Sequence, residues 1–152
     1  MNKQHQVMRL KRRRGATIVE FALIVPFVLA ILIGIMEFGW LIKNHLLLAN
    51  GTREGARTAS IGKSTSEIQT RIMNSVQPLS VVSPNGSILM QQSVDNGTTF
   101  IAWPPDVLTK NGVTQGKLIK ITVTTRHTSL TGFFPFLKNR NLTVFVTMRR
   151  EA

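Results

Sequence analysis

The sequence contains no cysteine, and only seven of its 152 residues are acidic. Without cysteine there is no disulfide framework, no cysteine-based metal site and no thiol nucleophile. His5, His45 and His127 are far apart in the chain, and none has a second ligand at the spacing of a metal site. The sequence also lacks a glycine-rich phosphate loop and a serine-nucleophile elbow. We therefore expect no cofactor, no metal, no small-molecule substrate and no catalysis.

Two of the acids, Asp95 and Asp106, lie in turn-rich stretches. Aspartate is favoured in turns because its side chain accepts hydrogen bonds from nearby backbone groups. We expect both to form turns. An enzyme, as the alternative, would need a pocket with converging polar groups in the C-terminal part of the chain.

The chain is strongly basic, with a net charge of +12 at pH 7. Six of its lysines and arginines precede residue 15, directly before a long apolar run. Basic residues next to a membrane segment tend to stay in the cytoplasm. We interpret this block as a topology signal and expect no binding of nucleic acid. It predicts a cytoplasmic N-terminus, with the chain after Lys43 outside.

The apolar run comprises residues 16–42, and its only charged residues are Glu20 and Glu37. As a helix it would be about 40 Å long, more than the roughly 30 Å hydrocarbon core of a bilayer. It is longer than the apolar part of a secretory signal, and no small-x-small cleavage pattern clearly follows it. Trp40 and Lys43 fit the outer interface. The run therefore predicts a transmembrane helix that stays attached to the mature protein.

Several motifs support a family resemblance. The basic leader, Gly15 and the segment Ala16-Thr17-Ile18-Val19-Glu20-Phe21 resemble the class III signal of type IV pilins and pseudopilins. More specific similarity to TadE-like pseudopilins of the tight-adherence (Flp) pilus lies in three further segments: Gly34-Ile35-Met36-Glu37-Phe38-Gly39, Arg53-Glu54-Gly55-Ala56-Arg57 and Thr147-Met148-Arg149-Arg150-Glu151. The resemblance is close at the N-terminus, loose at the C-terminus and absent in the middle.

The resemblance implies a minor pseudopilin that takes part in pilus assembly. A prepilin peptidase would cut between Gly15 and Ala16, and the helix would anchor the protein in the bacterial inner membrane. The implied partners are that peptidase, other Tad pseudopilins and the assembly platform, and the protein could enter a surface pilus. The alternative is an uncleaved single-pass membrane protein with an extracytoplasmic adhesin or binding domain.

Glu20 needs an explanation, because an ionisable group within a membrane helix is costly. Cleavage after Gly15 would create an ammonium group at Ala16, four residues before Glu20 and on the same helix face. An opposite charge of this kind, from the same or a neighbouring subunit, favours the ionised carboxylate. We predict that Glu20 registers incoming subunits; the alternative is a carboxylate that lies at headgroup level.

Further residues of the long helix are candidates for an interface with other helices. Ala30 and Gly34 form a small-xxx-small pair. Beyond the membrane segment, Arg53, Glu54 and Arg57 form a charged face that is either solvated or a contact with another subunit. The full set of interface candidates is Ala30, Gly34, Glu37, Arg53, Glu54, Gly55, Ala56 and Arg57. Asn50-Gly51 is a turn signal, so the helix either continues to about Ile61 or breaks and restarts with Thr52 as its N-cap.

The C-terminal part predicts a small α+β domain with a pilin-like architecture. A capping-box pattern at residues 64–67 predicts a helix over residues 65–76. The strand candidates are residues 79–82, 87–94, 98–103, 118–126 and 142–148, with the last two as partners. We expect the aromatic loop at residues 133–137 to pack onto the sheet or the long helix. The alternative is an exposed contact patch, which would be the first candidate for a partner site. The predicted organisation is a leader at 1–15, a membrane helix with its extension at 16–62, and the α+β domain at 63–152.

Overall fold

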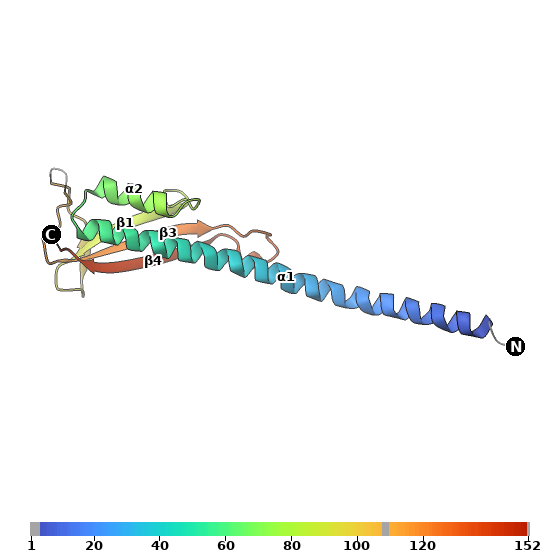
Figure 1. Cartoon of the computed structure of the whole chain (residues 1–152). Coiled ribbons are helices and arrows are strands. Elements are labelled where there is room, and N and C mark those ends of the chain that lie inside the picture. Colours follow the sequence, from blue (N-terminus) through green and yellow to red (C-terminus); the bar gives the residue numbers. More distant parts are fainter. Residues whose placement is uncertain (1–3, 108–109, 152) are drawn as a thin grey trace. The chain divides into compact units, whose positions relative to one another are not determined.

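The computed structural model describes residues 4–107 and 110–151. The chain divides into two compact units, one ending at Gly39 and the other beginning at Trp40. The long helix α1 (Gln4–Ser60) is followed by α2 (Thr65–Ser75) and an antiparallel sheet of four strands (Figure 1). This arrangement confirms the predicted α+β class, with a long apolar N-terminal helix and a small sheet domain.

Within the first unit, the apolar side chains of α1 point outward instead of packing on one another. Ile18, Phe21 and Phe27 are each about two-thirds exposed or more, with Phe27 at 72%. Among the described residues, Gly15–Ser60 is the one helix long and apolar enough to cross a membrane. So much exposed apolar surface requires a nonpolar environment, either lipid or other apolar helices.

In the second unit, α1 continues without a break through Gly51 to Ser60. The turn signal at Asn50-Gly51 is overridden because Gly51 packs against α2: a Cβ there would overlap with Cγ1 of Val76. Thr52 does not cap a new helix. Its hydroxyl instead donates a hydrogen bond of 2.7 Å to the carbonyl oxygen of Leu48 in the preceding turn.

Helix α2 begins as its sequence predicts. The Ser64 side chain accepts a hydrogen bond from the backbone of Glu67, whose carboxylate in turn accepts one from the Ser64 backbone. Both Ile68 and Ile72 are fully buried on the face that packs inward. A second, unpredicted acid supports the same helix end, because the Asp106 carboxylate accepts a 2.8 Å hydrogen bond from the Thr65 backbone N–H. Carboxylates at this end also interact favourably with the helix dipole.

The sheet has the order β2-β1-β3-β4, with β1 at Gly86–Ser93, β2 at Phe100–Ala102, β3 at Leu118–His127 and β4 at Arg140–Arg149. The predicted pairing of the last two strands is confirmed, with Ile121 opposite Val146. Asp95 forms the turn between β1 and β2, as expected, because its carboxylate accepts hydrogen bonds from the backbone of Thr98 and Thr99.

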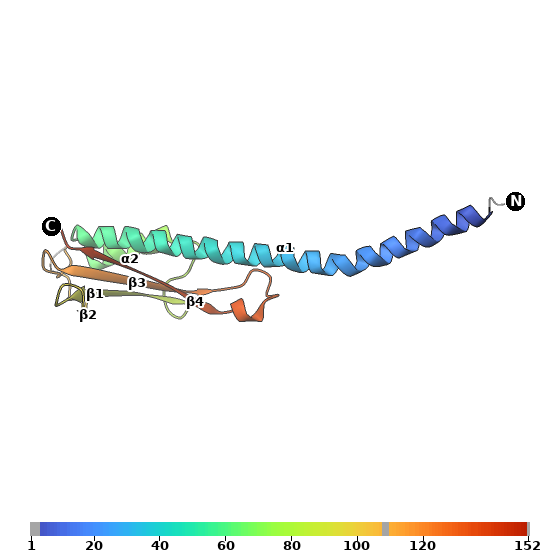
Figure 2. The ribbon, with the colours of Figure 1, turned by 90° about the horizontal axis from the view of Figure 1, so that it is seen from below.

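The core lies between one face of the sheet and the two helices. Ile119, Ile121 and Val123 of β3 are fully buried against Leu48 and Ala56 of α1, with α2 completing the cluster. Strand β3 runs antiparallel to α1. Leu118, at the start of β3, pairs with Arg149 near Ser60, the last residue of α1. His127, at the end of β3, lies 3.4 Å from the side chain of Asn44, which is earlier in α1. Figure 2 shows this part of α1 extending along the strands.

Two expectations about the domain were wrong. Residues 79–82 do not form a strand: the Ser80 carbonyl accepts a hydrogen bond from the side-chain hydroxyl of Thr125 on β3, which is not a backbone ladder bond. The aromatic loop at residues 133–137 does not pack its aromatic side chains onto the sheet or the long helix as predicted. Phe133 and Phe136 are more than half exposed, and Leu137 is the residue that the core buries.

Candidate functional site

The predicted processing site lies at an accessible part of α1. Gly15, Ala16 and Glu20 are all exposed, and a Cβ added at Gly15 would meet no atom within 4 Å. Glycine at this position therefore has no packing role within the described structure. The open space around position 15 is consistent with a small residue that is required for recognition by a peptidase. The role of Glu20 stays a prediction.

The other predicted membrane-helix residues differ in their burial. Ala30 and Gly34 are half-buried, whereas the larger neighbouring side chains of Phe27 and Ile31 are exposed. The two small residues therefore form a shallow depression in the helix surface. Such a site allows close approach of another helix. Glu37 is fully buried, in contrast to the exposed Glu20.

The charged face of α1 in the second unit consists of a small ionic network. The Glu54 carboxylate lies 3.3 Å from Nε of Arg57 and 3.6 Å from Nε of Arg71 on α2. The hydrogen bond from Arg57 is the main reason that the pKa of Glu54 is lowered, with further lowering by the charges of Arg57 and Arg71. The network therefore links α1 to α2 at the surface. Arg53, the remaining predicted member of this face, is exposed.

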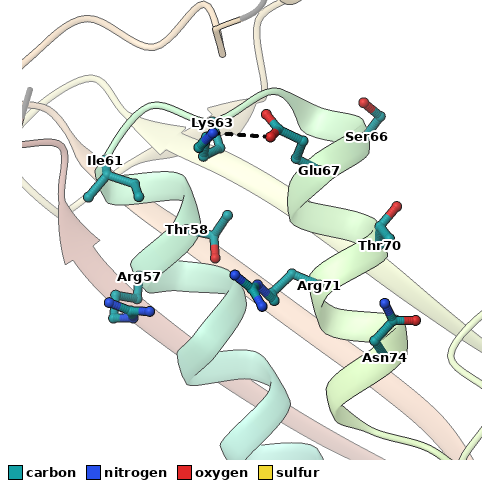
Figure 3. Close-up of a pocket in the computed structure, with 9 residues that line it drawn as sticks. All are labelled: Arg57, Thr58, Ile61, Lys63, Ser66, Glu67, Thr70, Arg71 and Asn74. Carbon is teal, nitrogen blue, oxygen red and sulfur yellow. Dashed lines mark hydrogen bonds and ion pairs between the residues drawn. The ribbon is translucent and has the colours of Figure 1, made fainter.

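A groove of about 430 Å³ separates the exposed sides of α1 and α2. Figure 3 shows Arg57 and Arg71 on opposite walls, with Lys63 and Glu67 paired at 3.2 Å at one end. The remaining lining residues are Thr58, Ile61, Ser66, Thr70 and Asn74. Within this groove each cation has a carboxylate partner, Glu54 or Glu67. The groove is thus a polar surface where ion pairs already satisfy the charges.

Two residues predicted for a subunit contact are used inside the domain. A Cβ on Gly55 would overlap with Cγ1 of Ile72, and Ala56 is completely buried. Their small size lets α2 lie close against α1. The part of this face that is available to another molecule therefore consists of Arg53, Arg57 and the half-buried Glu54.

Sequence reasoning missed three long-range features of the domain. Arg71 belongs to the ionic network, Asp106 caps α2, and Arg150 lies buried against the end of α1. The segment around Asp106 carries turn signals, but nothing in it points to a helix 41 residues earlier in the chain. No local pattern identifies contacts at such separations.

Comparison with known proteins supports the N-terminal resemblance. The family described as "TadE-like protein" matches residues 15–57, which include the predicted processing site, the apolar segment and the Arg53–Arg57 motif. No curated protein and no solved structure matches the chain. The match begins at Gly15, where the motifs place the end of the leader. Residues 15–57 are therefore similar to TadE-like proteins, and they include most of a helix that is long and apolar enough to cross a membrane.

Proposed function

We propose that this protein is a minor pseudopilin that takes part in assembling a tight-adherence (Flp) pilus. The TadE-like match beginning at Gly15 is the observation that carries this proposal. In this role, α1 anchors the protein in the bacterial inner membrane, with the basic N-terminus in the cytoplasm and the sheet domain outside. Its partners are the prepilin peptidase, other Tad pseudopilins and the assembly platform.

The proposed role is structural and involves no catalysis. Where the chain is described, no group of three or more histidine, cysteine, aspartate or glutamate side chains has the arrangement of a metal site. Asp95 and Asp106 hold a turn and a helix end through their hydrogen bonds. Glu54 and Glu67 are engaged in surface ion pairs. Most of the carboxylates in the domain therefore stabilise a turn, a helix end or an ion pair.

The processing step is tested by the mass of the mature protein. The full chain is produced in cells with and without a prepilin peptidase, and its N-terminus is determined by mass spectrometry. We expect Ala16 as the first residue only when the peptidase is present. An intact Met1 in both strains would overturn the proposal in favour of an uncleaved single-pass membrane protein.

A substitution at the cleavage site separates recognition from folding. Because a side chain at position 15 meets no atom within 4 Å, Gly15→Arg should leave the domain folded while blocking cleavage. Gly39→Ala is the matched control, since position 39 is equally open and lies far from the junction. The control should be processed normally. Removal of the leader from the Gly15→Arg protein would contradict the assigned site.

A further inference from the structure

The loop between β3 and β4 exposes a cluster of aromatic side chains. Phe133 and Phe136 are 55% and 56% exposed, and Leu130 is exposed as well. The Phe134 ring packs between the other two, with ring centroids 5.1 Å from Phe133 and 5.6 Å from Phe136. Nε of Arg140 donates a 2.9 Å hydrogen bond to the Phe136 carbonyl and so braces the turn η1 (Pro135–Leu137). The loop, residues 130–140, thus forms an exposed apolar tip whose backbone is held by the hydrogen bond from Arg140.

Positive charge surrounds this tip. Arg126, Lys138 and Arg140 are all exposed at the loop's ends. The sequence contains no aspartate or glutamate between residues 107 and 150, so no acid of that stretch neutralises these cations. Aromatic side chains combined with lysine and arginine are the composition that binds a membrane interface: the rings enter the headgroup region, and the cations attract anionic lipids.

The loop also lies at the end of the domain that contains Trp40 and Asn44, the part of α1 with which the second unit begins. His127, the last residue of β3, contacts Asn44 at 3.4 Å, and Arg126 and Thr128 line a groove with Trp40. Trp40 immediately follows the exposed apolar part of α1. Nζ of Lys43 lies 4.4 Å from the Trp40 ring centroid, in a pair suited to an interface. Figure 2 shows η1 at this end of the sheet, away from the C-terminus.

We propose that residues 130–140 dock on the anionic headgroups of the bilayer that the apolar segment crosses. This inference rests on the proposed membrane anchoring and adds a second attachment point to it. Trp40 and the aromatic loop would then hold the sheet domain against the bilayer surface. A second copy of the same loop is a poor occupant, because two acid-free basic tips repel one another. An anionic lipid surface supplies both an apolar layer and negative charge.

The depth of single probes in a bilayer tests the inference. The chain has no cysteine, so one introduced cysteine takes one nitroxide label. Full-length protein is placed in nanodiscs at one copy per disc, with phosphatidylglycerol mixed into phosphatidylcholine. Labels at Phe136→Cys, Leu29→Cys and Thr98→Cys report on the loop, the middle of the apolar segment and the opposite end of the domain. Collision rates with oxygen and with a water-soluble nickel complex give the depth of each label.

We expect the Leu29 label at hydrocarbon depth, the Phe136 label at headgroup depth and the Thr98 label in water. If the Leu29 label is deep while the Phe136 label is as accessible to nickel as the Thr98 label, the docking inference is wrong and the anchor stands. If the Leu29 label is in water, the anchor itself fails, and the docking fails with it. A Phe136 label protected only at several copies per disc would identify another subunit as the occupant and overturn the lipid assignment.

Charge variants test the role of the cations separately from that of the rings. In a protein carrying Arg126→Gln and Lys138→Gln, protection of the Phe136 label from nickel should fall several-fold and lose its dependence on phosphatidylglycerol. Lys110→Gln with Lys117→Gln removes the same charge from the opposite end of the domain and should change neither. Equal effects of the two pairs would show that net charge alone acts, which would contradict docking by this loop.

Discussion

Nη1 of Arg150 donates a 3.0 Å hydrogen bond to the carbonyl oxygen of Ser60, across a sequence separation of 90 residues. Ser60 is the last residue of α1, so this carbonyl has no partner within the helix. Arg150 is only 6% exposed, and its guanidinium lies against Gly62, where the missing Cβ leaves space for it and the φ of +86° favours glycine. A cation at this position also opposes the negative end of the helix dipole. The end of β4 is thereby fastened to the end of α1.

Loss of this contact should destabilise the domain. For Arg150→Gln we expect a decrease in unfolding free energy of about 1.5 to 3 kcal/mol, the range for a hydrogen bond to a charged group. Thermal unfolding of the detergent-solubilised protein, followed by circular dichroism, measures the change. Arg149→Gln is the control, because Arg149 is exposed and its substitution should shift stability by less than about 0.5 kcal/mol. Equal effects of both substitutions would argue against a specific helix cap.

The close approach of α1 and α2 makes a second prediction at Gly55. A Cβ there would overlap with Cγ1 of the fully buried Ile72, so Gly55→Ala should cost about 1 to 3 kcal/mol of overpacking, less the roughly 1 kcal/mol gained from helix propensity. In an Ile72→Ala background the overlap is gone, and the same change should be neutral or stabilising. A double-mutant cycle in thermal or urea unfolding measures this reversal. Additive effects would show that the two residues do not contact each other.

Those parts of the fold with local sequence signals were predicted well. Ser64 and Glu67 define the start of α2 because a capping box needs only a few neighbouring residues. The alternation of Ile119, Ile121 and Val123 predicted β3, since that strand buries one face only. Gly51 shows the limit of this approach. As an isolated signal it favours a turn, but its close packing against Val76, the C-cap residue of α2, keeps the helix continuous.

The candidate site was predictable where it lies within one helix and unpredictable where it depends on tertiary contacts. The order Gly15, Ala16, Glu20 is a local motif, and the family match covers it. Arg71, in contrast, lies 3.6 Å from Glu54 only because α2 packs against α1, which no local sequence pattern reveals. The aromatic loop was misjudged because its composition is equally typical of a core and of a contact surface. Only the exposure of Phe133 and Phe136 distinguishes the two.

The ionic network at Glu54 predicts a dependence of stability on acid pH. Its pKa in the folded protein is lowered from 4.5, chiefly by the hydrogen bond from Arg57. A carboxyl with a lowered folded-state pKa contributes stability above its unfolded-state pKa and loses that contribution as the pH falls through the folded-state value. The unfolding temperature should therefore decrease between about pH 5 and pH 3, and Glu54→Gln should make this decrease shallower.

The two arginines provide the matched comparison for that experiment. Arg57→Gln should flatten the acid dependence more than Arg71→Gln, because Arg57 supplies the dominant hydrogen bond and lies closer to Glu54. The Glu54 side chain is 31% exposed, so solvent screens part of the interaction and the differences will be small. An acid dependence that is steeper in Glu54→Gln than in the unmodified protein would contradict the assignment.

Glu20 gives the prediction that bears most directly on pilus assembly. If its carboxylate pairs with the new ammonium of Ala16 in the same or a neighbouring subunit, Glu20→Ala removes the attraction that sets the helix register. Membrane insertion should persist, because replacing an acid with alanine only makes the helix more apolar. We expect normal cleavage and membrane recovery, with a loss of most sheared pili or of most co-purifying pseudopilin.

Glu20→Gln and Val19→Ala complete the design for Glu20. The glutamine keeps the shape and hydrogen-bonding capacity of the side chain but removes its charge, so it should behave like Glu20→Ala if the ion pair is what matters. Val19 is a neighbour that is also exposed, on another helix face, and its substitution should leave assembly unchanged. Normal piliation with Glu20→Ala would refute the registration role. Normal piliation with Glu20→Gln alone would assign the role to hydrogen bonding at position 20, with the ammonium of Ala16 as donor and no requirement for a charged acceptor.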